Sequence, residues 1–308
     1  MIETQQATIG RPVSFIGIGL HSGQRCAVTV RPAPVDTGIR FVRHGTDAPP
    51  ARLPATWDHV TDSHLRTVLA NDQMRIATVE HLLAALRGLE IDNARVEVTG
   101  PEVPILDGSA LPFATLLSGA GRQRQGKRRL GLFINKSIVV RQDGRTAMLV
   151  PARHPKITVT IEFDHPAVGL QTFSQTLTRQ DFIHHFAAAR TFGFAEELEP
   201  QRARGLIRGA SLQNAILIRD GKVANAEGLR FENELARHKA LDVVGDLCLA
   251  SMPVIGHYIA HRPGHTLTVT LLRELMRRPE LWSIAPLSRN DDAVTPSQRA
   301  NDHSRPGT

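Results

Sequence analysis

Residues 229–247 (LRFENELARHKALDVVGDL) carry a histidine and two aspartates at intervals of four, namely His238, Asp242 and Asp246. Residues four apart in a helix lie on one face, one turn apart, so these side chains point to the same side. An imidazole and a carboxylate at this spacing can bind one divalent ion. The spacing alone is a weak signal, because most such pairs lie on a solvated helix surface.

A second candidate pair, Glu80 and His81, lies within the sequence TVEHLLAAL at residues 78–86. Adjacent helical residues point about 100° apart, so the two side chains cannot share one groove. A histidine ligand with a neighbouring carboxylate beside a metal-bound water is nevertheless a workable geometry. The alternative is a polar helix face that exposes both residues to solvent. The pattern departs from H-E-x-x-H because no second histidine lies at i+4.

Two loop-like segments complete the set of candidates. The sequence RPGH at residues 262–265 follows a predicted strand, so His265 is either an ordinary loop residue or a further site group. The glycine-rich residues 17–23 (GIGLHSG) fit neither the P-loop nor the dinucleotide-binding pattern, and they indicate a tight hairpin instead.

Together these residues suggest a reaction class. Three protein ligands, two from the second half of the chain and one from the first, would leave an open zinc position for water, as hydrolytic zinc sites require. A nearby carboxylate can take a proton from that water, and a cation can stabilise an oxyanion or protonate a leaving nitrogen. A purely structural zinc site is the alternative, but such sites usually have four protein ligands rich in cysteine.

The elements that must position these residues follow from the hydrophobic periodicity. A helix is predicted over residues 78–86, where Val79, Leu82 and Leu86 recur at helical spacing, with Thr78 as its cap and Gly88 at its end. Further helices are predicted near residues 181–189 and 233–250. Strands are predicted at residues 27–30, 95–98, 138–140, 148–150, 157–163, 215–219 and 254–260, which gives an α+β fold.

The length of 308 residues predicts two domains. Residues 119–129 (GAGRQRQGKRR) are basic, contain glycine and have few apolar side chains, which is typical of a linker. We therefore expect a first α+β domain at residues 1–122, a basic linker at 123–130 and a second α+β domain at 131–287. Residues 288–308 are polar and contain proline, and we expect a flexible tail there.

Composition limits the function classes. With 41% hydrophobic and 22% charged residues, the chain is neither disordered nor a coiled coil. Cys26 and Cys248 form no C-x-x-C pattern, so a reducing cytoplasm is expected. No apolar run approaches the about 18 residues of a spanning helix, so any membrane contact is expected to be peripheral.

The net charge of +7 suits an anionic partner. A nucleic-acid binder that uses the GRQRQGKRR segment is one alternative. Aromatic residues make up only 5% of the chain, and no RRM, KH or zinc-finger pattern occurs, so we expect no nucleic acid partner.

These motifs resemble the zinc-dependent UDP-3-O-acyl-N-acetylglucosamine deacetylases of lipid A synthesis. The resemblance covers residues 6–287 and rests on ordered motifs at residues 17–23 (GIGLHSG), 78–86 (TVEHLLAAL), 88–113, 189–194 (ARTFGF), 229–247 and 264–265 (GH). It implies two domains of similar layered sheet and helix architecture, with the active site in the cleft between them. It also implies hydrolysis of the substrate N-acetyl group with release of acetate, the committed step of the pathway.

The resemblance also implies roles for individual residues. His81, His238 and Asp242 would bind Zn²⁺, and Glu80 would be the general base. His265 would be charged, either stabilising the oxyanion or protonating the departing amine, and Asp246 would orient it. Catalytic support would come from Lys239, as a positive charge in the cleft, and from Thr191, as a hydrogen-bond partner of the tetrahedral intermediate.

The substrate is expected to be a UDP-linked acylated glucosamine. By resemblance, Phe163 stacks on uracil, while Arg262 and Lys239 meet the diphosphate. An insert at about residues 194–228 would form a passage for the acyl chain, lined by Leu198, Ile207, Ser211, Ala215 and Leu217. We expect a cytoplasmic monomer with at most peripheral contact with the inner membrane surface. The chain departs from many relatives in residues 63–70 (SHLRTVLA), which lack the family's cysteine.

Overall fold

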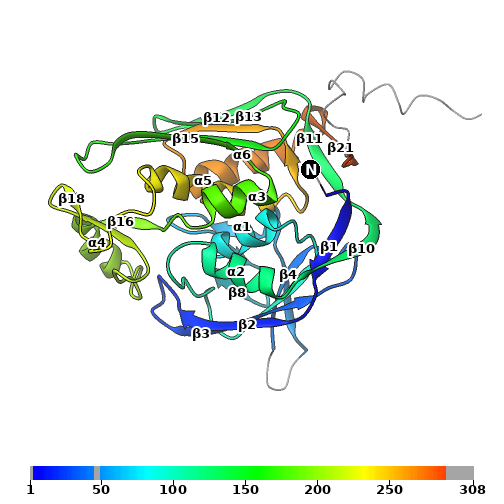
Figure 1. Cartoon of the computed structure of the whole chain (residues 1–308), viewed down its shortest axis with the longest axis horizontal. Coiled ribbons are helices and arrows are strands. Elements are labelled where there is room, and N and C mark those ends of the chain that lie inside the picture. The colour runs from blue at the N-terminus through cyan, green and yellow to red at the C-terminus, as the bar shows by residue number, and fades with distance from the viewer. Residues whose placement is uncertain (1–2, 45–48, 289–308) are drawn as a thin grey trace, which may run out of the picture.

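The computed structural model describes residues 3–44 and 49–288. Two sheets form the outer layers, and the long helices lie between them (Figure 1). The predicted tail at residues 288–308 lies outside the described residues, except for Ser288. Within the described ranges, none of the helices combines the length and apolar character needed to cross a membrane.

The first half of the chain forms a five-stranded sheet in the order β2-β3-β9-β4-β5. Its strands are β2 (Val13–Ile18), β3 (Arg25–Pro32), β4 (Ile39–Arg43), β5 (Ala51–Pro54) and β9 (Ala94–Val98). In β3, buried residues alternate with more exposed ones, so one face of the sheet packs inward. The glycine-rich segment at residues 17–23 turns β2 into the antiparallel β3, as the hairpin prediction requires.

The second half repeats this topology in the order β12-β13-β20-β14-β15. Its strands are β12 (Ile138–Gln142), β13 (Arg145–Val150), β14 (Lys156–Phe163), β15 (Gly169–Thr176) and β20 (His257–His261). In both sheets the strand that comes last in the chain lies in the middle of the sheet. Strand β9 is antiparallel to β3 and parallel to β4, and in the same way β20 is antiparallel to β13 and parallel to β14. The predicted α+β class is therefore confirmed, and the two halves share one layered architecture.

Two pairs of helices fill the space between the sheets. They are α1 (Glu80–Gly88), α2 (Leu111–Gly119), α5 (Glu234–Cys248) and α6 (His265–Met276). Helix α1 of the first half packs against α5 of the second (Figure 1). Buried apolar residues of both halves, such as Leu83 and Leu241, belong to one continuous cluster. The halves are therefore joined by a shared core.

Most predicted elements occur, with shifted ends. The helix predicted at 233–250 is α5, and the helix predicted near 181–189 is a short α3 (Arg179–Asp181) followed by a π-helical turn at Phe182–Phe186. The strand predicted at 254–260 is divided into β19 (Val254–Ile255) and β20. The prediction that Thr78 caps α1 is wrong, because Val79 holds the cap position without a side-chain hydrogen bond. Thr78 instead has a φ of 57° and precedes the helix.

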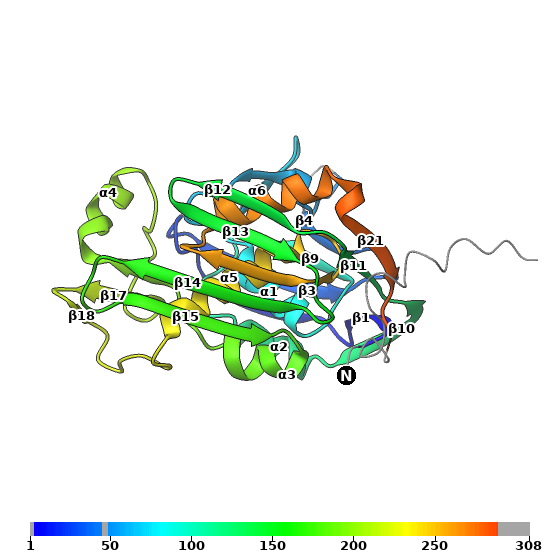
Figure 2. The ribbon, with the colours of Figure 1, turned by 90° about the horizontal axis from the view of Figure 1, so that it is seen from above.

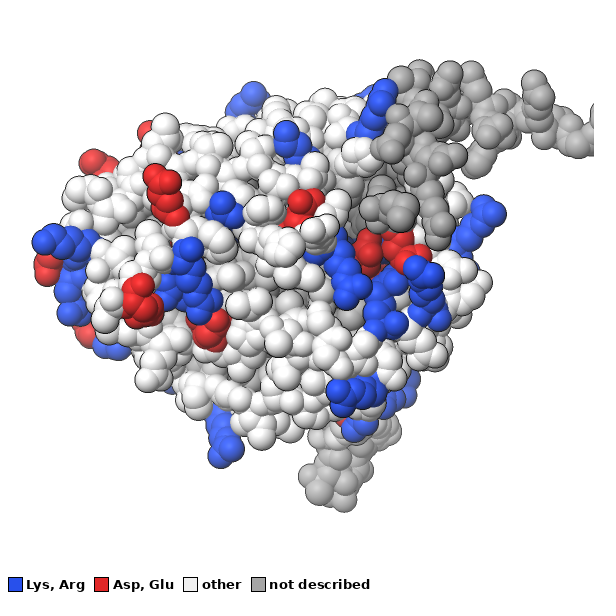
Figure 3. Space-filling model, in the orientation of Figure 1, with Lys and Arg blue, Asp and Glu red and all other residues white. Residues whose placement is uncertain are grey.

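The basic segment forms a regular strand. Strand β10 (Arg122–Arg128) pairs with the antiparallel β1 (Gln5–Ile9). Three of its cations meet carboxylates: Arg122 and Arg124 pair with Glu3, and Lys127 pairs with Asp36. Lysine and arginine side chains gather on the right of the view in Figure 3, on the side of the molecule where Figure 1 places β10. Strand β10 is largely exposed, which accounts for its few apolar side chains, and the linker and the domain boundaries stay predictions.

The remaining elements are short. They are β6 (Val60–Asp62), β7 (Val68–Ala70), β8 (Arg75–Ala77), β11 (Leu130–Ile134), β16 (Phe192–Phe194), β17 (Ile216–Arg219), β18 (Lys222–Val223), α4 (Leu198–Ala203), β21 (Trp282–Pro286) and 3-10 turns at Trp57–His59, Ala195–Glu197 and Pro279–Leu281. Seen from above, the segment with β17, β18 and α4 projects from one end of the molecule (Figure 2).

Candidate functional site

His81, His238 and Asp242 converge between α1 and α5. The Nε2 atoms of His81 and His238 lie 3.5 Å and 3.4 Å from Oδ1 of Asp242. The two imidazole rings are nearly perpendicular, with centroids 5.1 Å apart. One donor atom from each residue lies within 4.8 Å of the others, and all three side chains are buried. The structure therefore brings together the three side chains predicted to bind metal.

The donor set fits a divalent cation. Oδ1 of Asp242 is buried and has no hydrogen-bond partner among the described residues, although two imidazole nitrogens face it. Burial lowers the pKa of His238 to about 3, so its imidazole is neutral at pH 7. Burial would raise the pKa of Asp242, but His238, Lys239 and His265 outweigh it and hold that pKa well below its ordinary value. Neutral imidazoles and an ionised carboxylate are the forms that bind metals.

The backbone orients one of the imidazoles. Nδ1 of His238 lies 3.1 Å from the carbonyl oxygen of Ala189. A ring nitrogen that donates to a carbonyl fixes the tautomer, and this leaves Nε2 free to accept a metal. Sequence reasoning did not find this contact, because the partner is a main-chain atom of a distant segment.

Glu80 begins α1 beside the three converging residues. Its side chain is only 3% exposed, so the alternative of a solvated polar face for Glu80 and His81 is wrong. Oε2 accepts a hydrogen bond from the main-chain N–H of Thr67 at 3.1 Å, and Oε1 lies 3.8 Å from Nε2 of His265. Burial raises the pKa of Glu80, which makes its carboxylate a stronger base.

His265 is the first residue of α6 rather than a loop residue, and it faces the same space. Its Nδ1 lies 2.8 Å from Oδ2 of Asp246, whose Oδ1 accepts a hydrogen bond from the Thr67 hydroxyl at 2.6 Å. Burial lowers the pKa of His265, but Asp246, Asp242 and Glu80 outweigh it and raise the pKa to about 10. His265 is thus positively charged in this structure at pH 7.

Lys239 connects these residues to a neighbouring cavity. Its Nζ lies 2.8 Å from Oδ2 of Asp242 and 5.5 Å from the ring centroid of Phe192. A cavity of about 240 Å³ is lined by Lys239, Phe163 and Arg262, among others. The structure therefore brings together the three residues predicted to bind the nucleotide, although their roles stay predictions. Arg262 has a φ of 53°, a left-handed conformation that is unusual for a non-glycine residue.

The other predicted residues lie further along the same end of the molecule. Thr191 follows Ala189 by two residues, and its main-chain N–H donates to the Gly108 carbonyl at 2.8 Å. The predicted acyl-passage residues Leu198, Ile207, Ser211, Ala215 and Leu217 lie in α4, β17 and the loop between them. This loop contacts the β2–β3 hairpin, since Gly209 N–H donates to the Leu20 carbonyl at 2.9 Å. The acyl passage and the role of Thr191 stay predictions.

Glu102 is a buried carboxylate that sequence reasoning missed. It accepts hydrogen bonds from the main-chain N–H groups of His21 and Ser22 at 2.9 Å and 2.8 Å, and from the Thr78 hydroxyl at 2.7 Å. Glu102 thereby links the glycine-rich hairpin to Thr78, the residue of positive φ that lies before α1. Thr67 was also missed, because it lies outside any motif and contacts Glu80 and Asp246 only through the fold.

The arrangement combines three functions in one buried space. It holds a metal-binding group of two imidazoles and one carboxylate, a second carboxylate of raised pKa, and a charged imidazole held by Asp246. An acid and a base whose environments push their pKa values apart are typical of hydrolytic sites.

Comparison with known proteins agrees with this geometry. Residues 6–277 match the family described as LpxC: UDP-3-O-acyl N-acetylglycosamine deacetylase. The chain is 46% identical over 287 residues to the UDP-3-O-acyl-N-acetylglucosamine deacetylase of Myxococcus xanthus (strain DK1622), covering 93% of this chain and 91% of the relative. It is 45% identical to the protein of the same name from Geobacter sp. (strain M21), with 91% of each chain covered. A third such protein, from Teredinibacter turnerae (strain ATCC 39867 / T7901), is 40% identical, with 94% of this chain and 96% of the relative covered. The chain therefore belongs to the family of UDP-3-O-acyl-N-acetylglucosamine deacetylases.

Proposed function

We propose that this chain is a zinc-dependent amidase. It hydrolyses the N-acetyl group of UDP-3-O-(3-hydroxyacyl)-N-acetylglucosamine and releases acetate, the committed step of lipid A biosynthesis. The observation that carries this proposal is the convergence of His81, His238 and Asp242 beside Glu80 and His265. Family membership supplies the substrate class.

The metal-binding residues would be His81, His238 and Asp242. When bound there, zinc supplies Lewis acidity, which lowers the pKa of a water molecule and polarises a carbonyl group. Within residues 3–44 and 49–288, three side chains supply donors to this group, as in catalytic zinc sites that keep one position open. This donor count favours a catalytic ion over a structural one.

Glu80 is the proposed general base. Burial raises its pKa, and the Thr67 N–H holds Oε2, so Oε1 remains to take a proton from the attacking water. A carboxylate of raised pKa binds that proton more strongly than an exposed one. Thr67 also bonds Asp246, so one residue positions both the base and the partner of His265.

His265 is the proposed cation of the site. The carboxylate of Asp246 holds Nδ1, which leaves Nε2 facing Glu80 and Asp242 at 3.8 Å from each. A charged imidazole in this position either stabilises the oxyanion of the amide or protonates the departing nitrogen. Lys239 adds positive charge at Oδ2 of Asp242, the same oxygen that His265 faces. Thr191 is the proposed hydrogen-bond partner of the tetrahedral intermediate.

The nucleotide is proposed to occupy the cavity next to Lys239. Phe163 offers an aromatic face for uracil, and Arg262 and Lys239 offer cations for the diphosphate. The acyl chain would extend toward the insert at residues 194–228. We further propose a cytoplasmic monomer that meets its substrate at the inner membrane surface, and the net charge of +7 supports attraction to acidic lipid.

Metal analysis coupled to acetate release tests the proposal. The purified chain should contain about one zinc per chain and release acetate from the UDP-linked substrate. A chelator should abolish release, and added zinc should restore it. Unchanged acetate release from chelator-treated, metal-free protein would contradict the zinc-dependent mechanism, and no release from the zinc-loaded protein would contradict the activity.

A further inference from the structure

A second, larger cavity lies away from the proposed deacetylase site. Its volume is about 400 Å³, and neither the metal-binding group nor Glu80 or His265 lines it. It lies where the end of α1 meets the second half of the chain. We call it the rear cavity. Pockets of about 300 to 1,000 Å³ are typical of small-molecule sites.

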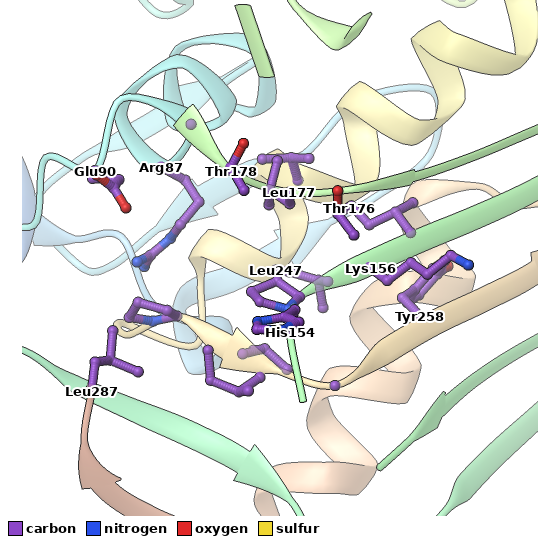
Figure 4. Close-up of a pocket in the computed structure, with 18 of the residues that line it drawn as sticks. Arg87, Glu90, His154, Lys156, Thr176, Leu177, Thr178, Leu247, Tyr258 and Leu287 are labelled. Carbon is purple, nitrogen blue, oxygen red and sulfur yellow. The ribbon is translucent and has the colours of Figure 1, made fainter. Parts of the chain in front are cut away.

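The walls of the rear cavity are mostly apolar. Helix α5 contributes Val244 and Leu247, and β20 contributes Tyr258. Figure 4 shows Leu177, Leu247, Tyr258 and Leu287 arranged around this space. A ligand with an apolar body would therefore be able to bury most of its surface here.

The charged side chains of the lining are mainly cations. Among the described residues, Arg87, Arg129, Lys156 and Arg179 line the cavity together with one carboxylate, Glu90. Glu90 already pairs with Arg129 at 3.3 Å. The lining therefore has an excess of positive charge, which favours an anionic ligand.

Arg87 is a buried cation of the lining whose charge is only weakly compensated by a carboxylate. Its side chain is only 10% exposed, and its buried Nη1 has no hydrogen-bond partner among the described residues. The nearest carboxylate oxygen, Oδ1 of Asp92, is 4.0 Å away and accepts a hydrogen bond from Arg129 at 2.6 Å. Figure 4 shows Arg87 extending from α1 toward the part of the cavity near Leu287. A buried guanidinium with an N–H group that lacks an acceptor can bind an anion strongly.

We propose that the rear cavity is a binding site for a small amphipathic carboxylate. Its anionic group pairs with Arg87, and its apolar body packs against Val244 and Leu247. The site is separate from the side chains proposed to bind metal, none of which lines it: on α1, His81 precedes Arg87 by six residues, or about 9 Å along the helix. Its existence does not depend on the deacetylase reaction.

Tyr258 provides a direct probe, because it is the only tyrosine in the chain and it lines the rear cavity. The full chain labelled with 3-fluorotyrosine should give one fluorine resonance. Sodium octanoate should shift this resonance in a saturable way. Neutral 1-octanol, which has the same chain length, should bind about ten-fold more weakly because it cannot form the charge-assisted contact with Arg87.

Two variants and one control complete the experiment. Arg87→Met should raise the dissociation constant of octanoate about ten-fold or more and should remove its advantage over octanol. Leu247→Trp should fill the cavity and abolish the shift. Arg277→Met, at an exposed arginine after α6, should bind octanoate as the unmodified chain does. If Arg87→Met does not fold, the comparison of octanoate with octanol still tests the proposal.

Three results would overturn the proposal. The first is that octanoate does not move the fluorine resonance of the full chain, and the second is that octanoate and octanol bind with equal affinity. The third is that the Arg87→Met variant folds and binds octanoate as tightly as the unmodified chain.

Discussion

Gly245 of α5 lies directly against the main-chain carbonyl of Glu80 in α1. A Cβ atom added at Gly245 would stand 2.2 Å from the Glu80 oxygen, closer than real Cβ contacts occur. Any larger residue at this position would therefore force the two helices apart. Because α1 carries His81 and α5 carries His238 and Asp242, this one glycine lets metal-binding side chains from both halves of the chain meet.

Gly245→Ala should lower the free energy of unfolding by about 1–3 kcal/mol, as overpacking in a core does. It should also weaken zinc binding, because the helices that carry the three side chains would separate. Denaturant unfolding and zinc titration measure the two effects. Gly119→Ala is the matched control, since a Cβ there meets no atom within 4 Å. Equal stability and zinc affinity in the two variants would contradict this account of the helix contact.

His238→Ala should lower the zinc content of the purified protein well below that of the unmodified chain, because one of the three donors is lost. Mass-spectrometric metal analysis measures the content. His184→Ala, at an exposed histidine, should retain zinc and serves as the control. A fully loaded His238→Ala protein would remove His238 from the set of ligands.

Glu80→Ala should retain zinc but lose activity on the order of 10² to 10⁴ fold, the usual contribution of a general base. Glu80→Gln should behave in the same way, because its amide keeps the shape of the side chain but cannot accept the proton. Acetate release, normalised to zinc content, measures the loss. Full turnover in either variant would exclude Glu80 as the base.

Asp246→Asn should lower the pKa of His265. In the unmodified chain burial lowers this pKa from 6.5, but Asp246, Asp242 and Glu80 outweigh burial and raise it to about 10. The charged imidazole therefore stabilises the metal-free fold fully below pH 6.5, and this stabilisation is lost as the pH rises through about 10. In Asp246→Asn the loss should occur at lower pH.

Unfolding of the metal-free chain between about pH 6 and pH 10, with an NMR titration of His265, checks this shift. Asp164→Asn, which alters a carboxylate of the cavity beside Lys239 rather than a partner of His265, is the control. An unchanged His265 titration in Asp246→Asn would show that Asp246 does not set the charge of the imidazole.

The helices and the α+β class could be predicted because their signals are local. Apolar residues at helical spacing gave α1 and α5, and the spacing of His238 and Asp242 put both on one face. The solvent exposure of the helix faces could not be predicted in this way. Helix α1 is buried at every residue except Arg87, so the solvated face that its polar residues suggested does not exist.

The long-range contacts could not be predicted either, because the signals in a sequence are local. Thr67 meets Asp246 across 179 positions of the chain, and Glu102 meets His21 across 81. Neither residue type stands out at its position. The basic strand β10 was not predicted as a strand, because a strand on the surface needs few apolar side chains when its backbone pairs with β1.

The repeated sheet topology has a consequence for folding. Each half contributes its own helix to the metal group, so a chain with only one half folded has either one ligand or two, never three. An ion that binds the complete group tightly therefore favours the state in which both halves are folded and docked, by linkage between binding and folding. Because the halves also share one core, depleting the ion should lower the temperature of a single melting transition for both halves together.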